Sequence, residues 1–375
     1  MPPEPPGAVR EVLDRAFPGG VDAVLHEVSE EPIAAGTVAQ VHRARLPGGE
    51  PVAVKVLRTG VTEDLCADFA LLSALAAAAE RMSRRARVLN LRGLVSELRG
   101  LLLSQTDLTH EARNYRRFAR EFGGDDTVRI PRVYSELTTR EVLVTELVEE
   151  VDPYDVARVA LHPATMAKRI DDLVDRMVFL SGLCHADLHP GNFFWTPEGR
   201  IVLVDLGLVH QLSKEERQHL LAFYSAVLDG FDEFAAAYVL RHLTIVAGAV
   251  DGAPIPAGAY EDVSAVVRAD WTEAGGRPAF SRTFMDLLQV LGRHGLQLRH
   301  RYSRLFLTLA TVEGYEYSLD PDFDVLENAR RKRVEQAEYV GIPPGGRRPR
   351  LPGVRHLLHG PVRRGGRPAA GLDRP

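Results

Sequence analysis

Three polar residues in the second half of the chain have the types and the spacing that phosphoryl transfer requires. Asp187 and Asn192 lie five residues apart in the sequence HADLHPGN, and Asp205 opens the sequence DLG directly after the apolar run IVLV. This order reproduces the phosphotransfer pattern H-R-D-x-x-x-x-N followed by D-F-G. Asp187 would orient the attacking oxygen or accept its proton, while Asn192 and Asp205 would supply oxygen ligands to Mg²⁺ on the nucleotide phosphates.

A second interpretation of the same segment is a metal site. His185, Asp187 and His189 alternate along the chain, and alternate residues of a strand point to one face, as ligands of a metal ion would. This interpretation leaves Asn192 and Asp205 without a role. The sequence therefore favours a nucleotide site.

A lysine earlier in the chain is a further candidate residue of the nucleotide site. Lys55 lies in the sequence VAVKV, which matches the V-A-I-K strand whose lysine contacts the α- and β-phosphates. A lysine on a strand of valine and alanine is costly to bury without an anionic partner, and Glu111, on a predicted helix, is the best candidate for that partner. The alternative is that Lys55 lies on an edge strand and extends to solvent.

The elements that position these residues can be predicted from periodicity. Alternation around the sequence PGG predicts a β-hairpin over residues 33–57. Residues 62–104 contain no proline and predict one or two helices broken near 90–93, followed by a helix from Leu108 to Phe122. We expect a second hairpin from residues 128–137 and 141–148. Beyond Pro153 the pattern is helical except for one strand-rich stretch, residues 184–208.

With these motifs the sequence resembles the UbiB/AarF/ADCK family of atypical, protein-kinase-like kinases. The resemblance spans roughly residues 30–335, and it includes AAGTVAQVH in place of a glycine-rich loop, VAVK, the segment 107–111, HADLHPGN, DLG and the late sequence LDPDFD. It implies an α+β, two-lobed protein-kinase-like fold. We expect the following organisation: an N-terminal helical segment, residues 1–30; a small lobe with a β-sheet, residues 31–150, that carries a helical insertion, residues 62–104; a mainly helical large lobe, residues 151–335; and a basic, flexible tail, residues 336–375.

The resemblance also implies an activity and a set of site residues. It implies Mg²⁺-dependent ATP binding with ATPase or atypical kinase activity, and a role in isoprenoid quinone biosynthesis or lipid homeostasis near membranes. Thr145 would lie deep in the adenine pocket, and the backbone of Glu146 and Val148 would bind the base. The loop over the phosphates would consist of Ala34, Ala35, Gly36, Thr37, Val38, Ala39 and Gln40.

The chain departs from the family pattern at four places. Residues 1–30 contain no K-x-G-Q motif, and the family's E-x-D sequence reads QTD from Gln105. Gly36 stands where a third alanine is usual, and glycine there predicts a freer backbone that approaches the phosphates closely. His189 occupies the place of the catalytic-loop lysine of protein kinases, so we expect a histidine to handle transition-state charge.

Two other classes of function stay open. One is a pseudokinase-like regulator that binds nucleotide and recruits partner enzymes; the other is a small-molecule phosphotransferase of the aminoglycoside or choline kinase kind, against which the alanine-rich loop counts. A peptide substrate is disfavoured, because only residues 208–212 separate DLG from a Ser-x-x-Glu capping box at Ser213. This leaves no room for an activation loop, and we expect a small-molecule or lipid acceptor, such as a quinone precursor.

Composition and charge restrict the cellular setting. The 375-residue chain has only two cysteines, Cys66 and Cys184, too few for a disulfide framework or a cysteine zinc site. Its longest nearly apolar run, Phe69 to Ala79, is about half of a membrane span, and residues 1–20 lack the apolar core of a signal peptide. These features predict a cytoplasmic protein.

The chain has a net charge of -5, but its C-terminal tail is basic. Residues 341–375 contain eight arginines and one aspartate. This tail could contact an anionic membrane at its inner face, with about 1 kcal/mol per arginine, or be a solvated extension or a weak nucleic-acid contact. We favour the solvated extension, expect no nucleic-acid partner, and keep peripheral membrane contact and quinone-biosynthesis enzymes as open partners.

Overall fold

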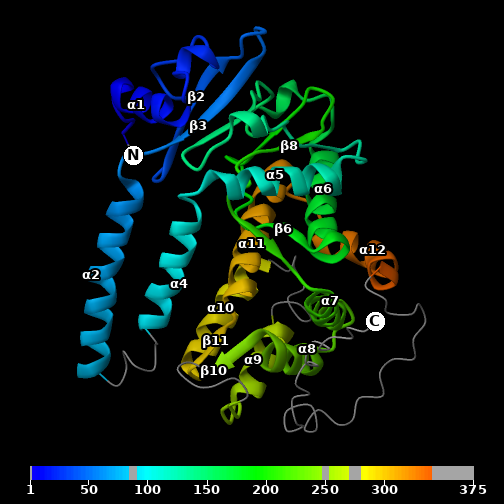
Figure 1. Ribbon diagram of the computed structural model, residues 1–375. Coiled ribbons are helices and arrows are strands. Elements are labelled where there is room, and N and C mark those ends of the chain that lie inside the picture. The colour runs from blue at the N-terminus through cyan, green and yellow to red at the C-terminus, as the bar shows by residue number, and fades with distance from the viewer. Residues whose placement is uncertain (1, 84–90, 247–252, 270–279, 340–375) are drawn as a thin grey trace, which may run out of the picture.

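The computed structural model describes residues 2–83, 91–246, 253–269 and 280–339 (Figure 1). Its strands are β1 (Ala34–Ala35), β2 (Ala39–Arg45), β3 (Pro51–Leu57), β4 (Val128–Arg129), β5 (Val142–Glu146), β6 (Leu183–His185), β7 (Phe193–Trp195), β8 (Ile201–Leu203), β9 (Val209–Gln211), β10 (Thr244–Val246) and β11 (Leu296–Leu298). Its helices are α1 (Pro6–Ala16), α2 (Val61–Met82), α4 (Leu91–Ser104), α5 (Leu108–Phe122), α6 (Pro163–Asp175), α7 (Lys214–Leu228), α8 (Asp232–Tyr238), α9 (Ala259–Val267), α10 (Phe280–Arg293), α11 (His300–Leu319) and α12 (Val325–Tyr339).

The first sheet is antiparallel and has the strand order β1-β2-β3-β5. The predicted hairpin is confirmed, with Lys55 of β3 opposite Val41 of β2 and Leu143 of β5. Lys55 therefore lies on a central strand, which excludes the edge-strand alternative. Gly49, with φ of 85°, supplies the left-handed residue of the turn.

The two faces of this sheet have different neighbours because side chains alternate along each strand. Val52, Val54 and Val56 are buried in a cluster with Val9 and Leu13 of α1. The residues between them, which include Lys55, face the opposite side. The N-terminal helix thus covers the outer face of the sheet and leaves its inner face open toward the rest of the molecule (Figure 1).

In the described part of residues 62–104, which leaves out 84–90, the chain forms helices α2 and α4, as the pattern predicts. They lie side by side and extend away from the sheet (Figure 1). Leu71, Leu72 and Leu75 of α2 are exposed. The chain returns to the sheet at the C-terminal end of α4.

Helix α5 has the predicted bounds. Asp107 caps it, because its side chain accepts a hydrogen bond from Thr109 N–H. Its buried face, which carries Glu111, Tyr115 and Phe118, packs beneath the inner face of the sheet. Helix α5 thus brings Glu111 below Lys55.

The predicted second hairpin is confirmed only in part. Residues 132–134 lie antiparallel to β5, since Val133 forms a bridge with Thr145, Tyr134 N–H donates to the Val144 carbonyl and Glu146 N–H donates to the Arg132 carbonyl. The start of the predicted strand is wrong, because Val128–Arg129 (β4) pairs in parallel with β8 of the later part of the chain. Pro131 lies between the two pairings and has no N–H to donate to a ladder, so the strand cannot continue.

The later part of the chain is mainly helical, and strands β6 to β9 occupy and slightly exceed the predicted stretch (Figure 1). The prediction of a single strand-rich interruption is wrong, because β10 and β11 form a second antiparallel pair. Each has three residues and their partners are far apart in sequence, so no local pattern marks them. Within the described ranges, no helix is both long and apolar enough to cross a bilayer. The predicted flexible tail falls largely on residues 340–375, which lie outside the described part.

Candidate functional site

A cleft lies between the inner face of the first sheet and two segments of the later part of the chain, residues 187–194 and 204–208. It consists of two adjoining hollows with volumes of about 640 and 320 Å³. Both hollows are lined by Lys55, Glu111, Asn192 and Asp205. Asp187 and His189 line the larger one. Side chains from distant parts of the sequence thus meet in one cavity.

Lys55 is the centre of the charge network in this cleft. Its Nζ donates to Glu111 Oε1 and Oε2 at 3.1 and 2.9 Å, and to Asp205 Oδ1 at 3.0 Å. The side chains of Lys55 and Glu111 are 17% and 5% exposed. The predicted ion pair between Lys55 and Glu111 is therefore confirmed, and Asp205 is part of it.

Burial and charge oppose each other in this network. Burial lowers the pKa of the Lys55 ammonium, but the charges of Glu111 and Asp205 outweigh it, so the net shift is upward. Burial raises the pKa of Glu111 to about 7, against the attraction of Lys55. Burial also opposes ionisation of Asp205, yet Lys55 holds its pKa below the usual range. Asp205 is thus a carboxylate at neutral pH, as a metal ligand must be.

The DLG segment is held in place by α5. Asp205 has a φ of 51°, in the left-handed region that is uncommon for residues other than glycine. Its N–H donates to the buried Tyr115 hydroxyl at 3.0 Å, and Asn114 Nδ2 donates to the Leu206 carbonyl at 2.8 Å. Helix α5 therefore fixes both the partner of Lys55 and the strained backbone of Asp205.

The loop from His185 to Asn192 is closed by its own hydrogen bonds. The buried imidazole of His185 lies 3.2 Å from the Val204 carbonyl through Nε2 and accepts from Asp187 N–H through Nδ1 at 3.2 Å. Burial lowers the pKa of His185, which fits a neutral ring with its proton on Nε2. Asn192 Nδ2 donates to the Asp187 carbonyl at 2.9 Å. This bond directs the amide nitrogen of Asn192 into the loop and leaves Oδ1 as the donor atom for a metal.

This geometry does not support the metal interpretation of His185, Asp187 and His189. Both ring nitrogens of His185 contact the backbone, and His185 is the last residue of β6, so the three residues do not share one strand face. Among the described residues no group of three or more His, Cys, Asp or Glu side chains could hold a metal by itself. Asn192 and Asp205 fit Mg²⁺, which usually takes one or two protein oxygens together with phosphate and water.

The alanine-rich loop connects β1 to β2 and lines the larger hollow. Gly36 N–H donates to the Ala39 carbonyl at 2.9 Å, and Arg58 Nε donates to the Gly36 carbonyl at 3.0 Å. The φ of Gly36 lies outside the left-handed region, and a Cβ there would stand 3.4 Å from the Ala39 oxygen, an ordinary contact. The backbone conformation at residue 36 therefore accepts a side chain, and the closer approach of the loop to phosphates stays a prediction.

Gln40 does not line the cleft, and this part of the loop prediction is wrong. Its side chain is 1% exposed, accepts from Glu4 N–H at 3.0 Å and lies 3.0 Å from His42 Nε2. Alternation along β2 turns Ala39 and Val41 toward the cleft and Gln40 away from it.

The smaller hollow contains the residues that the family resemblance assigns to the adenine pocket. Thr145, Glu146 and Val148 line it, as the family resemblance implies. The Glu146 N–H donates to the Arg132 carbonyl at 2.8 Å, so that N–H is already engaged. Sequence reasoning missed other residues that line this hollow. Two of them could have been found by alternation along a strand, Ala53 from Lys55 and Phe194 from Asn192. The missed apolar residues are Ile33, Val41, Ala53, Leu143, Leu147, Phe194 and Val204.

A comparison with known families agrees with this geometry. The model of the ABC1 atypical kinase-like domain matches residues 1–236. The chain belongs to this family. Two similar proteins, each described as a probable protein kinase UbiB, come from Pseudomonas entomophila and Pseudomonas putida GB-1; both are 29% identical, over 91% and 88% of this chain. This chain spans 65% and 62% of their lengths.

A solved structure of another protein has the same fold as this ABC1-family chain. It is titled the complex structure of Rv3197-erythromycin from Mycobacterium tuberculosis. Its chain is 21% identical, with a TM-score of 0.58 and coverage of 85% of this chain and 80% of that one. The likeness confirms the kinase-like fold.

The ABC1-family chain has a very short connection after DLG. A single residue, Leu208, separates Gly207 from β9, which pairs with β6. Helix α7 follows at once, and its predicted capping box is confirmed, because Ser213 and Glu216 exchange side-chain to backbone hydrogen bonds. This fully described stretch therefore leaves no room for a long activation loop between DLG and α7.

Proposed function

We propose that this chain binds ATP with Mg²⁺ and transfers or hydrolyses its terminal phosphoryl group. The observation that carries the proposal is the contact of Lys55 with both Glu111 and Asp205, in the same cleft as Asn192. A lysine that is paired with a helix glutamate and lies beside the aspartate of the DLG segment is the arrangement that kinase chemistry needs.

Each residue then has a defined task. Asn192 Oδ1 and the Asp205 carboxylate would hold Mg²⁺, which neutralises charge on the phosphates when bound. Lys55 would contact the phosphates, with Glu111 holding its ammonium in position. Asp187, whose side chain is 53% exposed in the cleft, would orient the attacking hydroxyl or water. His189 Nε2, 3.9 Å from Asp187 Oδ2, is close enough to assist with charge.

The acceptor we propose is a small molecule or a lipid, of the isoprenoid quinone kind that the family resemblance implies. The short connection between Gly207 and α7 supports this choice over a peptide. The Pseudomonas relatives are named probable protein kinases, but they are longer than this chain. Quinone-biosynthesis partners and peripheral membrane contact belong to the same proposal.

A thermal-shift titration with Mg-ATP, Mg-ADP and metal-free ATP tests the nucleotide site. A ligand at 100 times its dissociation constant stabilises the fold by about 2.7 kcal/mol. We expect a Mg²⁺-dependent rise of the melting temperature that Asp205→Asn abolishes. The matched control is Asp126→Asn, the same substitution at an exposed site, which should leave the rise unchanged.

Phosphate release separates binding from chemistry. Asp187→Asn should keep the Mg-ATP shift, because Asp187 is not a proposed metal ligand, but it should lower phosphate release at least 100-fold. A wild-type chain that shifts with Mg-ATP and releases no phosphate with any lipid or quinone precursor would favour the nucleotide-binding regulator. No shift with any nucleotide would refute the proposal.

A further inference from the structure

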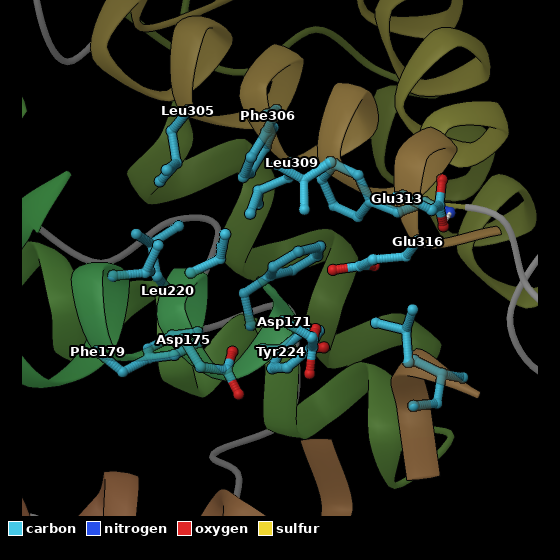
Figure 2. A pocket seen from close by; sticks show the side chains of 17 residues that line it. Asp171, Asp175, Phe179, Leu220, Tyr224, Leu305, Phe306, Leu309, Glu313 and Glu316 are labelled. Carbon is cyan, nitrogen blue, oxygen red and sulfur yellow. Dashed lines mark hydrogen bonds between the residues drawn. The ribbon is translucent and has the colours of Figure 1, made fainter. Parts of the chain in front are cut away.

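A second cavity lies in the helical part of the molecule, away from the nucleotide cleft (Figure 2). It has a volume of about 80 Å³. Residues of α6, of the π-helical turn that follows it (Arg176–Ser181), of α7, α10 and α11, and of the start of α12 line it. Most of its wall is apolar. The apolar and aromatic lining residues are Val174, Val178, Phe179, Leu220, Phe223, Tyr224, Phe280, Leu305, Phe306, Leu309, Val312, Val325 and Leu326.

Four carboxylates interrupt this apolar wall, and three of them have partners. Asp171 accepts from Asn328 Nδ2 and lies 3.4 Å from Lys332 Nζ, and Asp175 accepts from Lys332 Nζ at 3.1 Å. Glu313 accepts from the N–H groups of residues 280 and 281 at the start of α10, at 2.5 and 2.8 Å. These three carboxylates are therefore accounted for by contacts within the protein.

Glu316 is the fourth carboxylate and differs from the others. It is 2% exposed, and among the described residues its Oε1 has no hydrogen-bond partner. Figure 2 shows the Glu316 side chain reaching into the middle of the lining residues, whereas Asp171 and Asp175 lie at the lower edge. Burying a carboxylate oxygen without a donor is costly, so Glu316 Oε1 can accept a hydrogen bond from a bound donor.

Negatively charged side chains around the cavity outnumber the positively charged ones, which favours a bound cation. Lys332 faces Asp171, Asp172 and Asp175 together. Burial and the nearby Asp171 raise the pKa of Asp175 to about 7, and burial with Asp171 and Glu313 raises the pKa of Glu316 well above its usual value. Carboxyl groups that are shifted toward their neutral forms in this way would be stabilised as carboxylates by a further positive charge, which a bound cation could supply.

We propose that this cavity binds a small primary alkylammonium ion. Its ammonium group would donate to Glu316 Oε1, and its short chain would lie among Leu305, Phe306 and Leu309. The size supports a short unbranched chain, since about 80 Å³ is roughly half of the 150 Å³ cavity that accepts benzene. The cavity shares no lining residue with the nucleotide cleft, so the inference is independent of the proposed function.

The test compares n-butylammonium with n-butanol, which has the same chain without the charge, by ligand-observed NMR titration of the full chain. An alkyl ammonium has a pKa near that of lysine, about 10.4, and stays charged from pH 6 to 8. We expect the wild-type protein to bind n-butylammonium at least tenfold more tightly than n-butanol. Glu316→Gln should remove this preference, and Glu327→Gln, at a half-exposed site on α12, should keep it.

Proton competition gives a second readout. Ammonium binding needs an ionised Glu316, so its affinity should rise at least threefold from pH 6 to pH 8, while that of n-butanol stays constant. The titratable and charged groups that face Glu316 are Asp171, Asp172, Asp175, Tyr224, Glu313 and Lys332. Equal affinity for both probes, a preference that survives Glu316→Gln, or no binding by the wild-type protein would overturn the inference. The wild-type comparison needs no variant to fold.

Discussion

The ion pair between Lys55 and Glu111 makes a prediction that can be measured without any ligand. Glu111→Gln keeps the shape of the side chain but removes its charge. Glu111 is 5% exposed and accepts two hydrogen bonds from Lys55. Removing one partner of a buried pair typically costs 3–5 kcal/mol, but Asp205 remains 3.0 Å from Lys55. We therefore expect a loss at the lower end, about 3 kcal/mol of the free energy of unfolding.

A urea-unfolding double-mutant cycle with Lys55→Met measures the pair itself. Residues in direct contact show interaction energies of about 0.5–3 kcal/mol, and we expect about 2 kcal/mol for this buried pair. The matched control is Glu141→Gln, because Glu141 pairs with Arg15 at 2.7 Å but both side chains are about half exposed. An exposed pair contributes about 1 kcal/mol or less.

Two results would refute this reasoning. If Glu111→Gln costs no more than Glu141→Gln, burial does not strengthen the pair, and the position of Lys55 does not depend on Glu111. If the interaction energy of Lys55 with Glu111 is below about 0.5 kcal/mol, Asp205 alone holds the ammonium. Either outcome would remove the structural reason for assigning Glu111 a positioning role.

Two further predictions concern Tyr315 in the core and Gly36 in the alanine-rich loop. Tyr315→Phe should lower the free energy of unfolding by about 2 kcal/mol in urea titrations. The buried Tyr315 hydroxyl accepts a hydrogen bond from Trp195 Nε1 at 2.9 Å and donates one to the Pro153 carbonyl at 2.7 Å, and the substitution leaves both groups without this partner. A loss below about 0.5 kcal/mol would contradict this account. Gly36→Ala should leave the stability unchanged or raise it by up to about 1 kcal/mol, since the native backbone accepts alanine; a clear loss would show that the loop needs glycine after all.

Local patterns carried most of the information on the candidate site. The spacing of Asp187, Asn192 and Asp205 is a property of one short stretch, and a strand, a turn and a strand bring them to one place. Lys55 needed a partner because its strand is otherwise apolar, and that argument identified Glu111 across 56 residues. Chemistry that depends on a charge in an apolar strand can therefore be predicted before the fold is known.

The errors share a cause. The first residues of the predicted hairpin over 128–148 were misplaced because β4 pairs with β8, which lies more than 70 residues later. The pair β10–β11 was missed for the same reason, and Gln40 was misplaced because the register of β2 decides which side chains face the cleft. Strand pairing is set by distant partners, so a single strand's sequence does not contain it.

The sequence alone determined the family, the first hairpin, helix α5 and the residue types of the proposed phosphoryl-transfer site, because these depend on residue type and short spacing. Only the tertiary structure decided that Lys55 also contacts Asp205, that α5 fixes the backbone of Asp205, and that Glu316 is buried without a hydrogen-bond partner among the described residues. Those facts depend on packing between distant helices and strands. Burial and pairing are properties of the folded neighbourhood, and no window of sequence specifies them.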